Sequence, residues 1–205
     1  PRQGLITEMP TTITIRTAKA DYSRVVFNKW NMETGLKTAQ VKSQNDLTLS
    51  QGEEGNLIID PILSNNFIYT ENVNAAYLSF SGKLGEATQA QFGLRAEHTI
   101  SEANSSSTNT VLKRNYLNVF PSVFLSNKLS YNHTMVLSYS YRINRPSYLF
   151  LNSAHSYVDP YLYSIGNAFL QPDYPHSLEL KHGFQNNFYT SIGSSFVPTL
   201  ILYLL

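Results

Sequence analysis

The sequence of 205 residues contains no cysteine and few charged residues. Without cysteine, the chain can form neither a disulfide framework nor a thiolate metal site. Charged residues make up 14% of the chain, whereas soluble domains carry about 25%. The formal net charge is +1, and the largest cluster of basic residues is the pair Lys113 and Arg114. The chain therefore lacks the basic patch of a nucleic-acid-binding protein, and we expect no nucleic acid among its partners.

The sequence also lacks a long hydrophobic run. The longest uninterrupted apolar run extends from Leu200 to Leu205, which is far shorter than the about 18 to 20 residues that a transmembrane helix needs. Pro1 is not an initiator residue, and the residues after it lack the charged region followed by an apolar region that marks a secretory signal peptide. We therefore expect residues 1–205 to form a single, incomplete domain of a larger protein.

In place of charged side chains, the sequence carries uncharged polar and aromatic residues. It contains 23 Ser, 19 Asn and 16 Thr, together with 14 Tyr and 11 Phe. Apolar and polar residues alternate along much of the chain, a pattern typical of β-strands with one apolar and one polar face. The alternation is clearest in the segments 30–37, 89–100, 134–144 and 177–185, and it is less regular in 116–131, 11–25 and 67–81, where Glu71 interrupts it. An all-β, antiparallel fold is therefore predicted.

The connections between these segments alternate in length. Short connections are predicted at 26–29, 82–87, 127–133 and 186–188, and long ones at 43–65, 102–114 and 147–175. Short turns at one end and long loops at the other are typical of transmembrane β-barrels. Strands of 9 to 11 residues suffice to cross a bilayer, and the predicted strands reach this length. The pattern indicates an antiparallel barrel meander of about eight strands, belonging to a larger barrel.

Charged residues in the predicted strands with clean alternation lie on the polar face. An Arg or Lys that faced lipid near the midplane would cost about 2 to 4 kcal/mol, so we expect these residues to face the lumen. There they either line a solute path or pair with one another. A soluble antiparallel sheet would also keep charges off its core face, so charge placement alone does not decide between the two folds. The residues concerned are Glu33, Lys37, Arg95, Glu97, Arg142, Glu179 and Lys181.

Five segments of the chain carry a family resemblance in their order along the sequence. They run from Tyr69 to Phe80, Phe92 to Thr99, Tyr116 to Ser122, Arg142 to Tyr148 and Tyr157 to Asp173. Together they resemble the outer-membrane β-barrel family of Gram-negative bacteria that is related to TonB-dependent receptors. The resemblance implies an outer-membrane location, with membrane lipid as a partner. It also implies a barrel of about 22 strands, an N-terminal plug domain and uptake driven by an inner-membrane energy-coupling complex. We expect this chain to contain barrel wall and no plug domain.

No catalytic motif is recognisable, so we expect no enzyme, no cofactor and no metal site. The five His residues are scattered, without a pair at metal-ligand spacing. The long connection 147–175 is the candidate binding site, because long loops often carry function. Its aromatic and polar side chains either stack on and hydrogen-bond a ligand or pack the loop onto the barrel rim. The candidate ligand-binding residues are Tyr157, Asp159, Tyr161, Tyr163, Asn167 and Asp173.

Three functions remain open from the sequence. The first is a fragment of a transporter, similar to TonB-dependent receptors, that takes up an unidentified ligand. The second is a small structural or adhesive outer-membrane barrel without transport, filled by its own side chains. The third is a soluble β-sandwich that binds carbohydrate through aromatic loops. At the C-terminus, the alternation stops after Phe196, Pro198 cannot donate to a central ladder, and the chain does not end in the aromatic residue typical of such barrels. We therefore expect a truncated or frame-disrupted end.

Overall fold

The computed structural model describes residues 3–27, 29–53, 55–106, 109–153, 155–159, 162–185 and 187–198. Within these ranges the chain consists almost entirely of antiparallel β-strands. The elements are β1 (Gln3–Glu8), β2 (Thr11–Val26), β3 (Trp30–Glu53), β4 (Asn56–Ile59), β5 (Asn65–Leu84), β6 (Thr88–Ser105), β7 (Thr110–Ser130), β8 (His133–Tyr141), α1 (Tyr148–Leu151), β9 (His155–Asp159), β10 (Leu162–Ile165), β11 (His176–Phe184) and β12 (Phe188–Phe196). No helix in the described ranges is long and apolar enough to cross a membrane.

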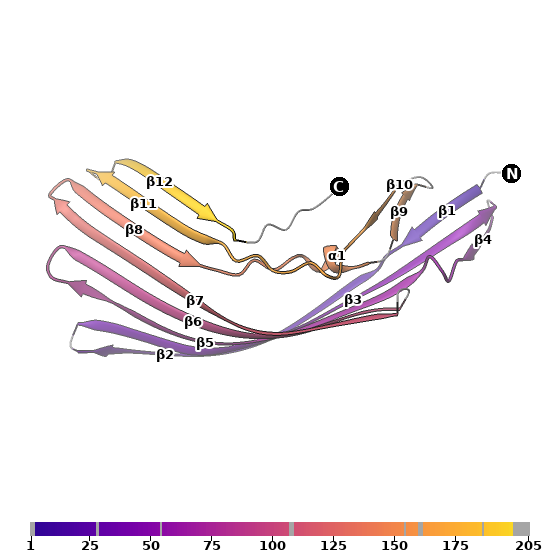
Figure 1. Cartoon of the computed structure of the whole chain (residues 1–205), viewed down its shortest axis with the longest axis horizontal. Helices are drawn as coiled ribbons and strands as arrows, with labels where there is room; N and C mark the ends of the chain where they lie inside the picture. The colour runs from indigo at the N-terminus through magenta and orange to yellow at the C-terminus, as the bar shows by residue number, and fades with distance from the viewer. Residues whose placement is uncertain are drawn as a thin grey trace.

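Ten of these strands form one sheet. β1 and β2 follow each other along the same edge of β3, and the order continues through β5, β6, β7, β8 and β11 to β12. The sheet is bowed, with the four short turns at one end and α1 on the concave side (Figure 1). Among the described residues, no strand pairs with the free edges of β2 and β12, so the sheet stays open. The predicted antiparallel meander is confirmed, with the architecture of a partial barrel.

Four central strands are much longer than a bilayer crossing requires. β3 has 24 residues, β5 has 20, β6 has 18 and β7 has 21, whereas about 9 to 11 residues are enough. The predicted loops 43–65 and 102–114 are therefore wrong in their bounds. β3 continues to Glu53 and β6 to Ser105, so most of each predicted loop is strand. The prediction of a long connection after β8 is correct.

Each long strand has an inner and an outer face. On β3 the odd positions from Gly35 onward are partly or fully buried as far as Leu49, whereas even positions such as Leu36 and Lys42 are exposed. Strand pairing carries the same faces across the sheet, because Leu36 pairs with Ala76 and Ala76 with Ala96. We call the face of Leu36, Ala76 and Ala96 the outer face and the opposite one the inner face.

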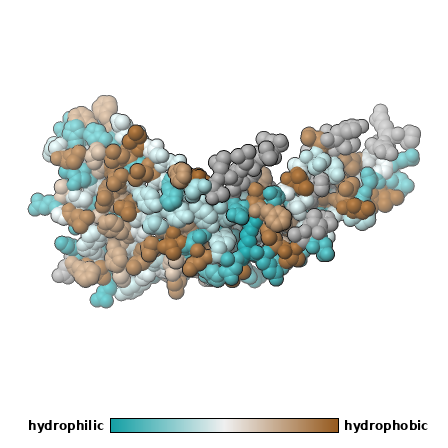
Figure 2. All heavy atoms as spheres, in the orientation of Figure 1, coloured by the Kyte–Doolittle hydropathy of each residue, from teal (hydrophilic) through white to brown (hydrophobic). Residues whose placement is uncertain are grey.

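The outer face is apolar toward the short turns and polar beyond them. Leu36, Leu78, Leu94 and Val119 are exposed large apolar residues on this face, and we call this zone the apolar belt. Figure 2 shows hydrophobic residues gathered toward the short-turn end and hydrophilic ones beside them, near the middle of the molecule. Farther along the outer face the residues are mostly polar, among them Arg16, Gln40, Lys42, Asn72, Thr70, Glu102, Asn115 and Lys113. The strands therefore extend beyond the membrane on the side of the long connections.

The inner face becomes apolar where the outer face becomes polar. Phe67, Tyr69, Ala103 and Leu151 form a buried cluster on the inner side. This change explains the irregular alternation of 67–81. Near the short turn, the apolar side chain of Leu78 points outward, whereas at the other end of β5 the apolar side chains of Phe67 and Tyr69 point inward. Alternation in a strand reports one buried face, so a strand that exchanges its apolar face midway cannot keep a single pattern.

Candidate functional site

The connection between β8 and β11 folds onto the inner face of the sheet. We call residues 142–175 the inner segment; it contains α1 and the small two-stranded sheet of β9 and β10. In Figure 1, α1 lies within the concavity of the sheet. Hydrogen bonds, ion pairs and apolar contacts attach the segment to β3, β5, β6 and β7, so it is fixed to the wall.

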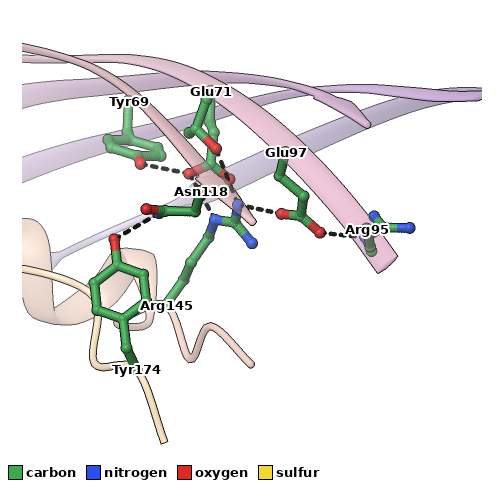
Figure 3. A network of polar contacts seen from close by, with 8 residues as sticks. Tyr69, Glu71, Arg95, Glu97, Asn118, Arg145 and Tyr174 are labelled. Atoms are coloured by element: carbon green, nitrogen blue, oxygen red, sulfur yellow. Dashed lines mark hydrogen bonds and ion pairs between the residues drawn. The ribbon is translucent and has the colours of Figure 1, made fainter. Parts of the chain in front are cut away.

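Arg145 of the inner segment lies between two carboxylates of the wall. Its Nη2 atom is 2.9 Å from Oε2 of Glu97 on β6, and its Nε atom is 3.5 Å from Oε1 of Glu71 on β5. Nη2 also donates to the Thr99 hydroxyl at 3.0 Å. On the far side of Glu97, Nε of Arg95 lies 2.6 Å from Oε1. Figure 3 shows Arg145 reaching both carboxylates from the inner segment.

This network is shielded from solvent and balanced in charge. The side chains of Glu71 and Glu97 are 6% and 9% exposed, and that of Arg145 is 25% exposed. Burial disfavours the charged guanidinium, but the hydrogen bond to Glu97 and the charges of Glu71 and Glu97 outweigh it and hold the pKa of Arg145 above its ordinary value. Two carboxylates face two guanidinium groups, so removing Arg145 would leave a buried carboxylate without its partner.

Amide side chains form a second attachment, at the α1 end of the inner segment. Nδ2 of Asn152 donates to Oδ1 of Asn45 on β3 at 2.9 Å, and Asn65 of β5 donates to Oδ1 of Asn152 at 3.4 Å. All three asparagines are buried. Buried amides require partners, and here each amide meets one from a different part of the chain. The segment is therefore held in one position along the strands.

A third attachment runs from β7 to the end of the inner segment. Arg114 donates to the carbonyl oxygens of Leu170 at 2.6 Å and Ala168 at 2.9 Å. Asn118 donates to the hydroxyl of Tyr174 at 2.9 Å, as Figure 3 shows. Because one guanidinium satisfies two backbone carbonyls, the chain between β10 and β11 is held against the wall.

Aromatic packing supports these polar contacts. The rings of Tyr148 and Tyr69 lie with centroids 5.1 Å apart, and Tyr148 packs with Leu112 and Leu170 against the buried cluster that contains Leu151. Burial raises the pKa of the Tyr148 hydroxyl above its ordinary value. The α1 turn is thus anchored by apolar area, whereas the ends of the segment are anchored by hydrogen bonds.

Among the candidate ligand-binding residues that the structure describes, two tyrosines lie together and two polar residues make local contacts of their own. Tyr157 and Tyr163 face each other across β9 and β10, with ring centroids 5.5 Å apart. The Asn167 side chain accepts from the Phe169 N–H, and Asp173 forms a backbone bridge with Asn144. Asp159 ends β9, and Tyr161 lies outside the described residues. Their role in binding a ligand stays a prediction.

The charged residues expected to face the lumen differ in their contacts and in the strand on which they lie. Strand pairing links Lys37 to Ala75 and Ala75 to Glu97, so Lys37 shares the face of the Arg145 network. Glu33 lies on the same face of β3, because it precedes Gly35 by two residues. On β11, Glu179 pairs with Ser138 and Lys181 with Val136. The β7 partners of Ser138 and Val136 pair in turn with Gln91 and Gln89 on the inner face of β6, so Glu179 and Lys181 also face inward. Arg95 and Glu97 pair directly, whereas Arg142 donates its backbone N–H to Pro175. Their part in a solute path stays a prediction.

Sequence reasoning missed Glu71 and Arg145 as partners. Glu71 was visible as the one acid in the apolar row of 67–81, and Arg145 lies in the segment from Arg142 to Tyr148 that carries the resemblance. Neither signal identifies the other, because the two residues are 74 positions apart in the chain. Among the described residues, no three His, Cys, Asp or Glu side chains form a group that could hold a metal ion.

An apolar belt, a polar inner face and a segment fixed within the concavity define this chain as the wall of a membrane β-barrel. More specifically, the chain belongs to the outer membrane protein beta-barrel family, whose model matches residues 2–202. The protein is located in the outer membrane. This family match confirms the predicted location and the resemblance to an outer-membrane β-barrel family found in the sequence. The likeness to two solved structures adds support for the predicted fold class.

Two solved structures have a similar fold. The ferric citrate transporter FecA in its unliganded form matches with a TM-score of 0.62 at 17% identity, covering 92% of this chain and 28% of that chain. The ferric yersiniabactin uptake receptor FyuA from Yersinia pestis matches with a TM-score of 0.63 at 14% identity, covering 93% of this chain and 29% of that chain. The chain thus spans less than a third of the length of either structure. No curated protein matches the sequence.

Proposed function

We propose that this chain forms part of the wall of an outer-membrane transporter, and that the inner segment narrows its lumen and contacts the transported solute. The observation that carries this proposal is the Arg145 network. A loop that merely closed two strands would have no need of a shielded ion-pair network with two strands of the wall. Fixing a segment inside a barrel restricts what passes through it.

The structural likeness to FecA and FyuA supports the transport part of this proposal at the level of fold. Those proteins are named for ferric citrate transport and ferric yersiniabactin uptake. The solute of the present protein is unidentified. The resemblance noted in the sequence adds a plug domain and an inner-membrane energy-coupling complex to the proposal. Within this division, residues 1–205 supply wall and constriction, and they carry no catalytic step.

Cysteine labelling from outside the cell tests the proposed lumen. This chain has no cysteine of its own, so single replacements in it report one position each. Lys181→Cys places a thiol on the inner face of β11, and the neighbouring Leu180→Cys places one on the outer face, in the rung of Leu137 and Ile192. A charged, membrane-impermeant methanethiosulfonate is expected to modify Lys181→Cys at least tenfold faster than Leu180→Cys, because hydrocarbon excludes the charged reagent.

The role of the inner segment is tested in the same background. Removing residues 155–165, which include β9 and β10, is expected to speed the modification of Lys181→Cys severalfold, since less of the lumen is occupied. The Leu180→Cys rate is expected to stay unchanged in the shortened protein. Equal rates at the two cysteines would refute a solvent-filled lumen, and an unchanged Lys181→Cys rate after the deletion would refute the constriction.

A further inference from the structure

A groove of about 560 Å³ crosses the outer face of the sheet. It runs across five neighbouring strands, from Ala18 and Ala20 on β2 to Leu117 on β7, and includes Leu36 on β3. It lies on the side opposite to the inner segment, because Leu36, Ala76 and Ala96 define the outer face. Lys19, Lys37 and Ala75, which belong to the inner-facing rows, also border the groove, whereas no residue of the Arg145 network lines it. A ligand bound over the outer face would therefore leave that network free.

Small side chains form much of the floor of the groove, because strand pairing places three alanines in one row with Leu36. Ala20 pairs with Leu36, Leu36 with Ala76, and Ala76 with Ala96. The next pair of outward-facing residues toward the short turns is large, because Leu78 pairs there with Leu94. A short side chain between larger ones leaves room above the sheet, so the groove results directly from the register.

The other rim of the groove is polar. The Thr38 hydroxyl donates to Oδ1 of Asn74 at 2.8 Å, and the His98 ring lies 2.7 Å from Oδ1 of Asn115. Thr38, Asn74 and His98 form one rung across β3, β5 and β6. Hydrocarbon tolerates polar side chains poorly, so the groove lies where the apolar belt ends and the polar zone of the membrane begins.

The groove has the length of one lipid chain. From β2 to β7 it crosses four strand spacings of about 4.8 Å, or about 19 Å, whereas one leaflet of the hydrocarbon core is about 15 Å thick. Strands in such barrels tilt by about 35 to 45°. A groove that runs across tilted strands therefore slopes through the leaflet, as an acyl chain in contact with the wall would.

Two cations lie just beyond the polar rim. Arg16 pairs with Gln40, and Lys42 follows two residues later on the same outer face. Diagonal neighbours of this kind are about 7 to 8 Å apart, a spacing that lets both side chains reach one phosphate. Within the described ranges, neither residue takes part in an ion pair, whereas Lys113 on the same face is bound to Glu102 at 3.2 Å.

We propose that this groove holds one acyl chain of a phosphate-bearing membrane lipid, with Arg16 and Lys42 binding its phosphate. Apolar lining, chain-like length and two cations beyond the polar rim, on β2 and β3, match the amphipathic shape of such a lipid. An uncharged lipid would use only the groove, and a soluble anion would use only the cations. The combination favours a lipid that has both parts.

Native mass spectrometry of the intact protein tests this proposal. The protein is loaded with dimyristoyl phosphatidylglycerol, and bound lipid is counted while detergent strips the annular lipids away. One phosphatidylglycerol per protein is expected to remain on the native sequence. Dimyristoylglycerol, which has the same chains and no phosphate, is expected to be retained at least tenfold more weakly. Equal retention of the two lipids, or none retained by the native protein, would overturn the proposal.

Two sets of variants separate the groove from the cations. Ala96→Trp fills the groove and is expected to abolish the retained lipid, whereas Leu94→Trp, on the same strand and face but outside the lining, is expected to keep it. Arg16→Gln combined with Lys42→Gln is expected to weaken retention at least tenfold, whereas Lys113→Gln leaves it unchanged. Heat-dependent gel mobility confirms folding, and Ala76→Leu replaces Ala96→Trp if the latter does not fold. Native-like retention in the groove variant or in the double variant would contradict the assignment.

Discussion

Single residues decide how firmly the inner segment is held. Arg145 and Asn152 each contact groups on two different strands, and Arg114 binds two backbone carbonyls of the inner segment. Such contacts differ from exposed ion pairs, which contribute about 0.2 to 1 kcal/mol. Lys19 and Asp21, an exposed pair at 2.7 Å, belong to that weaker kind. The residues that matter are those whose partners are shielded and come from distant strands.

Arg145→Gln is expected to loosen the inner segment without unfolding the barrel. A hydrogen bond to a charged group contributes about 1.5 to 3 kcal/mol, and the partial exposure of Arg145 lowers the value here to about 2 kcal/mol. This corresponds to about a thirtyfold increase in the population of the undocked segment. Hydrogen exchange of residues 142–175 measures this population. Arg142→Gln is the matched control, because the Arg142 side chain lies outside the network; equal exchange in both variants would speak against the role of Arg145.

Gly166→Ala is expected to displace the turn that follows β10. An added Cβ atom would lie 2.6 Å from the carbonyl oxygen of Phe150 and would also collide with that of Asn152. Both are backbone atoms, and Gly166 donates its own N–H to Asn152 at 2.8 Å. We expect faster proteolytic cleavage within the inner segment. Gly193→Ala, whose Cβ would meet atoms at 3.6 Å or more, is expected to cleave at the native rate, and a native rate for Gly166→Ala would show that the turn adapts.

Individual strands combine two environments along their length. In β5, the outer face carries Leu78 within the apolar belt and Thr70 beyond it, eight residues apart. The inner face carries Tyr77 at one level and the buried Phe67 at another. Because the strand remains hydrogen-bonded throughout, the change of environment shows only in its side chains. The change from apolar to polar residues on the outer face of such a strand therefore marks the edge of the membrane.

The membrane boundary on β5 can be tested with two arginine substitutions. Leu78→Arg is expected to lower the stability of the folded barrel by about 2 kcal/mol, near the lower limit for a lipid-facing cation. Thr70→Arg, on the same face of the same strand, is expected to change it by less than about 0.5 kcal/mol. Denaturant unfolding in detergent or lipid measures both. Similar losses at the two sites would place Thr70 in hydrocarbon and move the boundary.

At the scale of the whole molecule, the open sheet is the decisive feature. Unpaired backbone groups cost several kcal/mol each in lipid, and the described residues leave the edges of β2 and β12 without partners. The chain covers 28% and 29% of the two similar structures. The free edges are thus where further strands of a larger barrel are expected to pair.

The larger barrel and the small structural or adhesive barrel differ in how residues 1–205 behave alone. Produced alone, these residues are expected to give a protease-sensitive, aggregation-prone product, because two strand edges stay unpaired. The intact protein in the outer membrane is expected to resist trypsin and to migrate differently on gels before and after heating. A resistant, monomeric barrel formed by residues 1–205 alone would instead support the small barrel.

Much of the fold could be predicted from alternation alone. The segments 89–100, 134–144 and 177–185 lie within or close to β6, β8 and β11, because each has one face in a uniform environment. The bounds of β3 and β6 could not be predicted, since beyond the apolar belt their outer faces carry polar residues that also suit loops. The long connection 147–175 was predicted, but its contacts with the wall and the ion pairs of nearby Arg145 with Glu71 and Glu97 were not identified.

The sequence by itself determined the faces of the cleanly alternating strands, the placement of their charges on the polar face and the long connection after β8. These features are local, because a two-residue period and a turn depend only on neighbouring residues. Only the tertiary structure decided which residues of that connection meet the wall and where the alanines of neighbouring strands line up. The first depends on how the inner segment folds back onto the sheet, which brings Arg145 to Glu71. The second depends on strand register, which aligns Ala20 with Ala96. Both join residues far apart in the sequence, and no local pattern encodes such a distance.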